Sequence, residues 1–229
     1  MNSKGTGLTL SLGIVAAIIG YVLWQVTIGF DTKVDDVQTI LTNSAAGSTN
    51  LQISFILVCV GLVVHAAGLI NTRGTASGTS ESLGIVCIVA AIAVWVTSSG
   101  VGIALAEMGE KYVAAAGAGD AGAATAGSIA VAGGFAQSAT VAANTLGGLL
   151  AGIGWVFMGL AYRSSDAKGA LSFIPLGWLA LITGLILVVS TLVVNPLVSI
   201  EVGSQISGIS FILIVLWSVL RGIVLIQEA

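Results

Sequence analysis

Apolar residues fill six long runs of the chain, and short polar segments separate them. A helix needs about 20 apolar residues to cross the roughly 30 Å hydrocarbon core of a bilayer. The pattern therefore predicts an all-α integral membrane protein, a six-helix transmembrane bundle that forms one domain over residues 1–229. The predicted spans are residues 8–28, 51–70, 83–104, 141–162, 171–194 and 205–226.

The third run does not end cleanly, because residues 106–116 are good helix formers with charges at spacings that suit a solvated helix. An alanine and glycine stretch, residues 114–134, follows and leads into the fourth run. We expect helices three and four to extend into an Ala/Gly-rich extracytoplasmic hairpin over residues 105–140, which turns near residues 117–122.

A continuous helix over residues 123–163 would be about 60 Å long at 1.5 Å per residue, twice the thickness of the hydrocarbon core. Two arrangements fit this length. Either the hairpin protrudes from the bilayer, or the pair Gly133 and Gly134 breaks the helix.

The connections carry turn and capping signals. Residues 30–50 are predicted to form a polar loop. Pro175 is expected in the first turn of the fifth span, where its missing N–H costs little, and Asn195-Pro196 is expected to end that span. Ser204 is the expected cap of the sixth span.

The composition indicates lipid as the solvent. The 229 residues include 7 Lys and Arg and 10 Asp and Glu, 56% are hydrophobic, and the mean hydropathy is +1.08. A soluble domain needs far more charge to cover its surface. The net charge of -3 provides no basic face for nucleic acid.

The basic residues predict the orientation, because cytoplasmic loops carry an excess of Lys and Arg. With both termini in the cytoplasm, five of the seven lie on or near the inner side, against Lys33 and Lys111 outside. We expect a multi-pass protein of the cell (plasma) membrane, and the absence of N-x-Ser/Thr acceptor sites fits a prokaryotic source. The five inner residues are Lys4, Arg73, Arg163, Lys168 and Arg221.

Few residues could carry chemistry. His65 is the only histidine, so clustered metal ligands are missing, and no Gly-rich turn precedes Lys-Ser or Lys-Thr as in a phosphate-binding loop. We expect no metal, no cofactor and no intrinsic enzymatic activity, although the chain could be accessory to a membrane enzyme.

His65 and Arg221 are the ionisable candidates for an inner gate. His65 lies about 9 Å inside the cytoplasmic boundary by the rise per residue, so it either hydrogen bonds as a neutral structural group or handles protons or solute. Arg221 lies four or five residues from the inner helix end, where it either anchors the helix by reaching the interface or acts as a gate.

Polar residues fall in the outer halves of the spans. They either line a water-filled vestibule for a small polar solute or bond neighbouring helices, at about 0.6 kcal/mol each. The bonding interpretation is favoured because no charge lies deep enough to drive coupled transport. The candidate vestibule residues are Gln25, Gln52, Ser98, Gln137, Thr140, Asn144, Asn195 and Gln205.

Small residues recur at helical spacing, which lets backbones approach closely. They predict helix-packing or interface positions at Ala16, Gly20, Gly133, Gly134, Gly147, Gly148, Ala151 and Gly152.

Taken with the missing catalytic groups, these surfaces predict a non-catalytic membrane subunit. Its expected partners are membrane lipid and either other membrane subunits or copies of itself in a homo-oligomer. The alternative is a channel or facilitator for a small polar or neutral solute.

Overall fold

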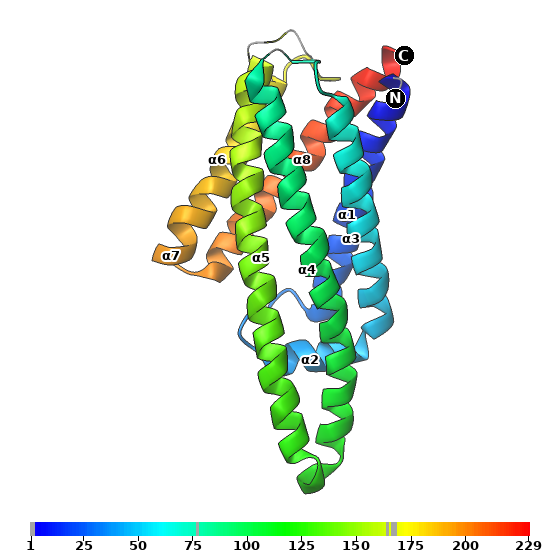
Figure 1. The fold of residues 1–229 in the computed structure, drawn as a ribbon, viewed down its shortest axis with the longest axis vertical. Coiled ribbons are helices and arrows are strands. Elements are labelled where there is room, and N and C mark those ends of the chain that lie inside the picture. The colour runs from blue at the N-terminus through cyan, green and yellow to red at the C-terminus, as the bar shows by residue number, and fades with distance from the viewer. Residues whose placement is uncertain (1–2, 77, 164, 166–168) are drawn as a thin grey trace. The chain divides into compact units, whose positions relative to one another are not determined.

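The computed structural model describes residues 3–76, 78–163, 165 and 169–229, and every regular element in these ranges is a helix (Figure 1). Six helical segments are long and apolar enough to cross a membrane, which confirms the expectation of a multi-pass helical protein. They are α1 (Ser3–Ile28), α3 (Ser48–Asn71), α4 (Thr79–Gly117), α5 (Ala123–Arg163), the segment Leu176–Leu197, and α8 (Ile200–Gln227).

The predicted polar loop over residues 30–50 is wrong in part, because it contains the short helix α2 (Val37–Ala46). Asp36 caps this helix by accepting a hydrogen bond from the Thr39 backbone N–H at 3.1 Å. Ile40 and Leu41 are buried on one face. The helix is too short to stand alone in water, so its packing against the longer helices stabilises it.

The fifth span begins later than predicted. Pro175 does not lie in the first turn but precedes it, with an extended backbone, and α6 covers Leu176–Val189. The span also does not stop at Asn195. A π-helical turn, η2 (Ser190–Val194), leads into a last short turn, α7 (Asn195–Leu197). Proline is tolerated there because it occupies the first turn of α7.

The sixth span begins earlier than predicted. Ser199, not Ser204, caps α8, and its hydroxyl oxygen accepts a hydrogen bond from the Val202 backbone N–H at 3.2 Å. Ser199 has the extended backbone that a capping residue needs, whereas Ser204 is already inside the helix.

α4 and α5 are each one continuous helix, and a single 3-10 turn, η1 (Gly119–Ala121), lies between them. Gly133 and Gly134 do not interrupt α5. Gly119 has a φ of +62°, a conformation that glycine adopts without steric cost and that suits the sharp reversal.

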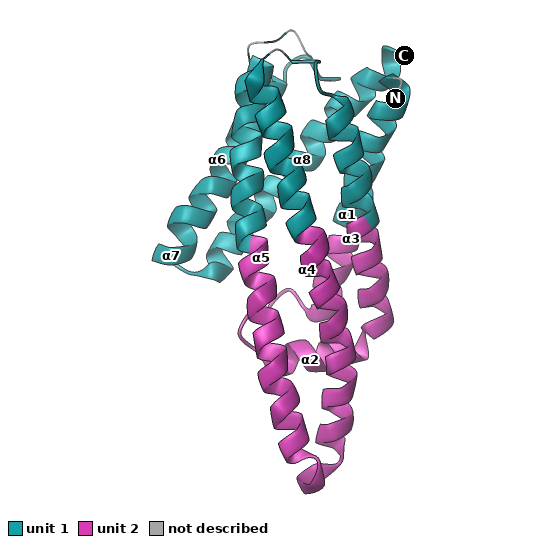
Figure 2. Ribbon diagram, in the orientation of Figure 1, with its two compact units in different colours: residues 1–18, 60–94, 145–229 teal, residues 19–59, 95–144 magenta. Residues whose placement is uncertain are grey.

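The contacts divide the chain into two compact units (Figure 2). Unit 1 comprises residues 1–18, 60–94 and 145–229, and unit 2 comprises residues 19–59 and 95–144. In unit 2 a small apolar core gathers Ile28, Ile40, Leu51 and Ala106 against two partly buried aromatic rings, Trp24 and Phe55.

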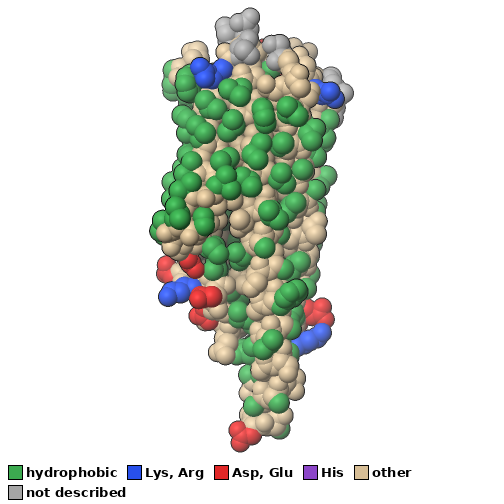
Figure 3. Space-filling view, turned by 60° about the vertical axis from the view of Figure 1, so that its left-hand side comes forward, with side chains coloured by type: hydrophobic (Ala, Val, Ile, Leu, Met, Phe, Trp, Pro, Cys, Tyr) green, Lys and Arg blue, Asp and Glu red, His purple; other side chains and the backbone are tan. Residues whose placement is uncertain are grey.

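Apolar side chains cover much of the face shown in Figure 3. Ile56, Val60 and Ile212, for example, are each more than half exposed, as expected where lipid and not water surrounds a helix. Two of the charged residues that the sequence assigns to the loop after α5, Asp166 and Lys168, lie outside the described residues.

Candidate functional site

Small residues bring α1 and α3 into close contact in unit 1. A Cβ on Gly61 would lie 2.5 Å from the backbone nitrogen of Ala17, and Gly13 faces the backbone of His65 and Gly61. Ala16, the residue that the sequence singles out, is only half-buried. The packing face therefore runs through Gly13 and Ala17.

The same contact continues in unit 2. A Cβ on Gly20 would lie 2.6 Å from the carbonyl oxygen of Ser54 and 2.9 Å from the Leu57 Cβ. The predicted packing position at Gly20 is thus occupied by α3.

Two of the four small residues of the fourth predicted span, Gly148 and Gly152, face η2 and α6. A Cβ on Gly152 would lie 2.9 Å from the Leu187 Cβ, and one on Gly148 would lie 3.5 Å from the Thr191 Oγ1. Gly147 and Ala151 are also buried. This surface packs against a helix of the same chain and is not open to a partner.

In unit 2, Gly133 and Gly134 face α2. A Cβ on Gly133 would lie 3.1 Å from the Leu41 Cδ1, and one on Gly134 would lie 3.6 Å from the Val37 Cγ2. From the other side, Gly109 of α4 faces the Leu41 carbonyl and the Ala45 backbone. α2 therefore packs against both long helices.

The structure brings few of the candidate vestibule residues together. Ser98 and Asn144 form one such pair, since the Ser98 Oγ donates to the Asn144 Oδ1 at 3.5 Å. Gln25 donates to the Tyr21 hydroxyl at 2.8 Å, and Thr140 donates to its own helix at the Ala136 carbonyl.

The remaining members differ in exposure. Gln52 and Gln205 are exposed, and Gln137 is half-buried. Asn195 belongs to a separate group in unit 1 that is described below. These contacts fit helix bonding better than one continuous lining.

His65 is buried, with 1% of its surface exposed. Its Nδ1 lies 2.9 Å from the Leu10 carbonyl oxygen of α1. Since a carbonyl can only accept, Nδ1 carries the proton in this bond, and the Nε2 lone pair is available. Nε2 has no hydrogen-bond partner among the described residues.

Arg221 is also buried, with 4% of its surface exposed, so it does not reach to the surface as an anchor would. It lies beside the buried hydroxyl of Tyr162, close enough to interact electrostatically. The same hydroxyl lies 3.1 Å from the Thr75 Oγ1.

Glu81 completes this polar group and was not singled out by its sequence pattern. Its carboxylate accepts hydrogen bonds from the Gly74 N–H at 2.6 Å and the Ala76 N–H at 3.0 Å, and it is 2% exposed. The signal that could have identified it is its place in the first turn of α4, where a negative charge is favourable to the helix dipole.

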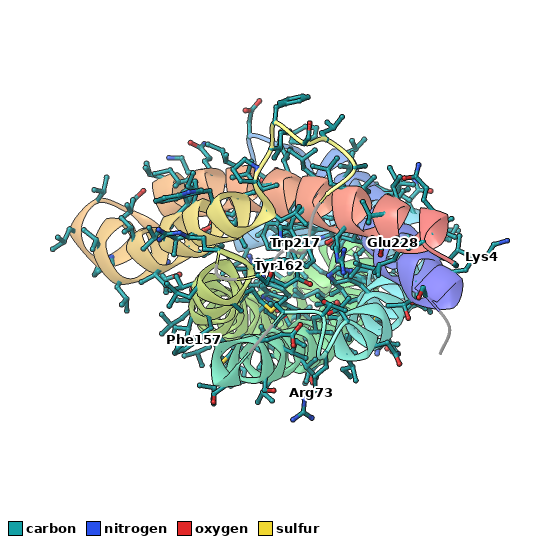
Figure 4. The ribbon with its side chains drawn as sticks, turned by 90° about the horizontal axis from the view of Figure 1, so that it is seen from above. Lys4, Arg73, Phe157, Tyr162, Trp217 and Glu228 are labelled. Carbon is teal, nitrogen blue, oxygen red and sulfur yellow. The ribbon has the colours of Figure 1, made fainter. Side chains whose placement is uncertain are left out.

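Three aromatic rings lie under the polar group. Trp217 makes edge contacts with Trp155 and Tyr162, with ring centroids 5.0 and 5.1 Å apart. Figure 4 shows Trp217 and Tyr162 side by side in the interior. These contacts are of the kind that strengthens aromatic packing, so this end of unit 1 is a packed interior with polar groups embedded in it.

A second polar group lies where η2 meets α8 in unit 1. Ser190 donates to the Gly203 carbonyl at 2.5 Å, and Ser207 donates to the Ser190 Oγ at 3.0 Å. The Asn195 Oδ1 is buried without a hydrogen-bond partner among the described residues. The sequence singles out Asn195 but not its neighbours, because seventeen positions separate Ser190 from Ser207.

Within the described residues, no three His, Cys, Asp or Glu side chains form a group that could hold a metal ion. A scan against protein-family models found no match, and searches of the curated proteins and of the solved structures found none either.

Proposed function

We propose that the chain is a non-catalytic integral membrane subunit that assembles with another membrane chain or with copies of itself. The contact surface is the arm, defined here as residues 110–132, which comprises the end of α4, the turn η1 and the start of α5. The observation that carries the proposal is the exposure of this arm beyond its packing against α2.

Most residues of the arm are exposed in the structure, although Gly122 and Ala126 are buried. Val131 is 77% exposed, and a Cβ on Gly117, Gly119 or Gly127 would meet nothing within 4 Å. Two paired helices of alanine and glycine offer a smooth surface that another backbone can approach closely. Such a surface favours contact with another protein and is not suited to binding a polar solute.

The buried polar groups support a structural role. Glu81 accepts hydrogen bonds from its own loop, and the His65 ring bonds the backbone of α1. Since these bonds join segments of this chain, we assign the chain no reaction of its own.

The basic residues support the proposed topology, with both termini in the cytoplasm and the arm outside the cell membrane. Lys4, Arg73 and Arg163 are exposed, as the positive-inside rule expects of cytoplasmic residues. A Gly119→Cys variant should react with a membrane-impermeant maleimide in intact cells. Reaction only after lysis would reverse the topology.

The first experiment is to measure the mass of the particle extracted in mild detergent from its own membrane and to identify the chains in it. The proposal expects a mass well above the 22.8 kDa chain, with partners in fixed stoichiometry. A lone monomer that binds no other chain would contradict the proposal.

A substitution in the arm makes this experiment specific. Gly127→Leu adds bulk where the chain has open space, so it should reduce assembly without unfolding the protein. Ile212→Ser is the matched control, because Ile212 is 64% exposed on α8, away from the arm in sequence. Equal assembly in both variants would remove the arm as the contact surface.

A second candidate function is a facilitator for a small solute. The π-helical turn η2 interrupts the fifth span, and interrupted helices expose backbone oxygens that bind ions and solutes in transporters. Flux of a small polar solute into liposomes that contain the purified chain would favour this function, and tight liposomes would disfavour it.

A further inference from the structure

The polar group between η2 and α8 is rich in oxygen atoms. The Ser190 hydroxyl donates to the Gly203 carbonyl at 2.5 Å and accepts from the Ser207 hydroxyl at 3.0 Å. Ser190 is fully buried. The Ser190 Oγ therefore lies within hydrogen-bond reach of two oxygens of α8, and hydroxyl protons can rotate to leave lone pairs free.

A fourth oxygen points at the same place. A Cβ built on Gly203 would overlap the Asn195 Oδ1 and would lie 3.3 Å from the Ser190 Oγ. The Asn195 Oδ1 thus fills the space that the missing side chain leaves, and the Ser190 Oγ lies next to that space. The Asn195 Oδ1 is buried without a donor among the described residues, and an unpaired buried acceptor is costly.

The backbone adds to the excess of acceptors. The Asn195 N–H bonds the Ser190 carbonyl across five residues, as a π-helical turn requires. Pro196 has no N–H, so it cannot donate to a carbonyl of the preceding turn. In lipid such a group must find a partner within the protein.

We propose that these oxygens bind a monovalent cation of the size of Na⁺. The ligands are the Asn195 Oδ1, the Ser190 and Ser207 hydroxyls and the Gly203 carbonyl, all of them neutral oxygens. Divalent cations rely on carboxylate ligands, which this set lacks, whereas neutral oxygens at an interrupted helix suit Na⁺. The site stands independently of the proposed assembly role.

The test is the unfolding temperature of the purified full-length protein in nanodiscs, measured against NaCl with choline chloride holding the ionic strength constant. The proposal expects a rise that saturates with NaCl and is absent in choline alone, because a ligand that binds only the folded state stabilises it. Asn195→Leu and Ser190→Ala should each weaken the apparent Na⁺ affinity at least tenfold.

Ser138→Ala is the matched control, because Ser138 is exposed and bonds only its own helix at the Gly134 carbonyl. It should keep the full response to NaCl. If Asn195→Leu fails to fold, the milder Ser207→Ala and direct binding of radioactive Na⁺ to the unmodified protein replace it.

Two results would overturn the site. Identical unfolding temperatures in NaCl and choline chloride, together with no bound radioactive Na⁺, would mean that the Asn195 amide is turned and donates to its serine neighbour, so that no cation is needed. An unchanged Na⁺ response in Ser190→Ala and Ser207→Ala would place any cation elsewhere.

Discussion

The two ends of α5 are built from similar residues and have different surroundings. In unit 1, Gly152, Gly154 and Gly159 all meet other helices so closely that a Cβ would lie within 3 Å of a neighbouring atom. In unit 2, Gly127 meets nothing within 4 Å. A small-residue pattern therefore identifies a surface that allows close approach. It does not tell whether the partner belongs to the same chain.

The largest loss of stability should come from replacing a closely packed glycine by a larger residue. In Gly154→Leu the first added carbon would lie 2.6 Å from the Ile88 Cγ1 and 2.8 Å from the Gly84 carbonyl oxygen. The backbone of α4 cannot move aside as a side chain can. We therefore expect the free energy of unfolding to fall by about 3 kcal/mol, at the upper end of overpacking costs. Thermal unfolding in detergent measures it.

Gly127→Leu is the companion substitution and should leave the unfolding temperature unchanged. If both variants lost stability equally, the contrast between the two ends of α5 would be false, and the arm would be packed in the isolated chain.

An intermediate loss of stability should come from removing the buried carboxylate of Glu81 in unit 1. Glu81→Ala would leave the Gly74 and Ala76 N–H groups without their acceptor, and an unsatisfied buried donor such as the Ala76 N–H costs about 2 kcal/mol. Glu81→Gln keeps one acceptor oxygen and should lose less. Equal losses of unfolding temperature in the two variants would show that the charge, and not the hydrogen bonds, matters.

The smallest loss of stability should come from an exposed ion pair on the part of α4 that extends the third predicted span. Lys111 and Glu107 form an ion pair at 2.8 Å, and both side chains are about two-thirds exposed. Exposed pairs contribute little because water and salt screen them. Lys111→Ala should therefore leave the unfolding temperature within error at low and high salt, and a clear shift would indicate that something covers this surface.

The spans were predictable because hydropathy over some twenty residues reports directly on lipid exposure. The helix ends were less predictable, because Ser199 and Ser204 are equally good capping residues by sequence and only the fold shows that Ser199 is the cap. α2 escaped prediction because ten residues with two buried apolar side chains give a weak signal until the long helices provide a surface.

The polar groups were predictable one residue at a time. His65 and Asn195 stand out in apolar surroundings, but the Leu10 carbonyl and Gly203 that they face have no chemical signature in a sequence. For Arg221 the sequence left open an anchor at the membrane surface or a gate, and its burial beside Tyr162 depends on a polar neighbour that no local pattern indicates.

The contact between the first and last helices affects how the protein is made. Gly7 and Ser11 of α1 pack on Gly222 and Ser218 of α8, and Ser11 and Ser218 are 207 positions apart. At a synthesis rate of 5–20 residues per second, roughly 10 to 40 seconds pass between the synthesis of Ser11 on α1 and that of Ser218 on α8. During that time Gly7 and Ser11 lack their contact on α8, so a chain released before residue 218 would leave this face of α1 uncovered.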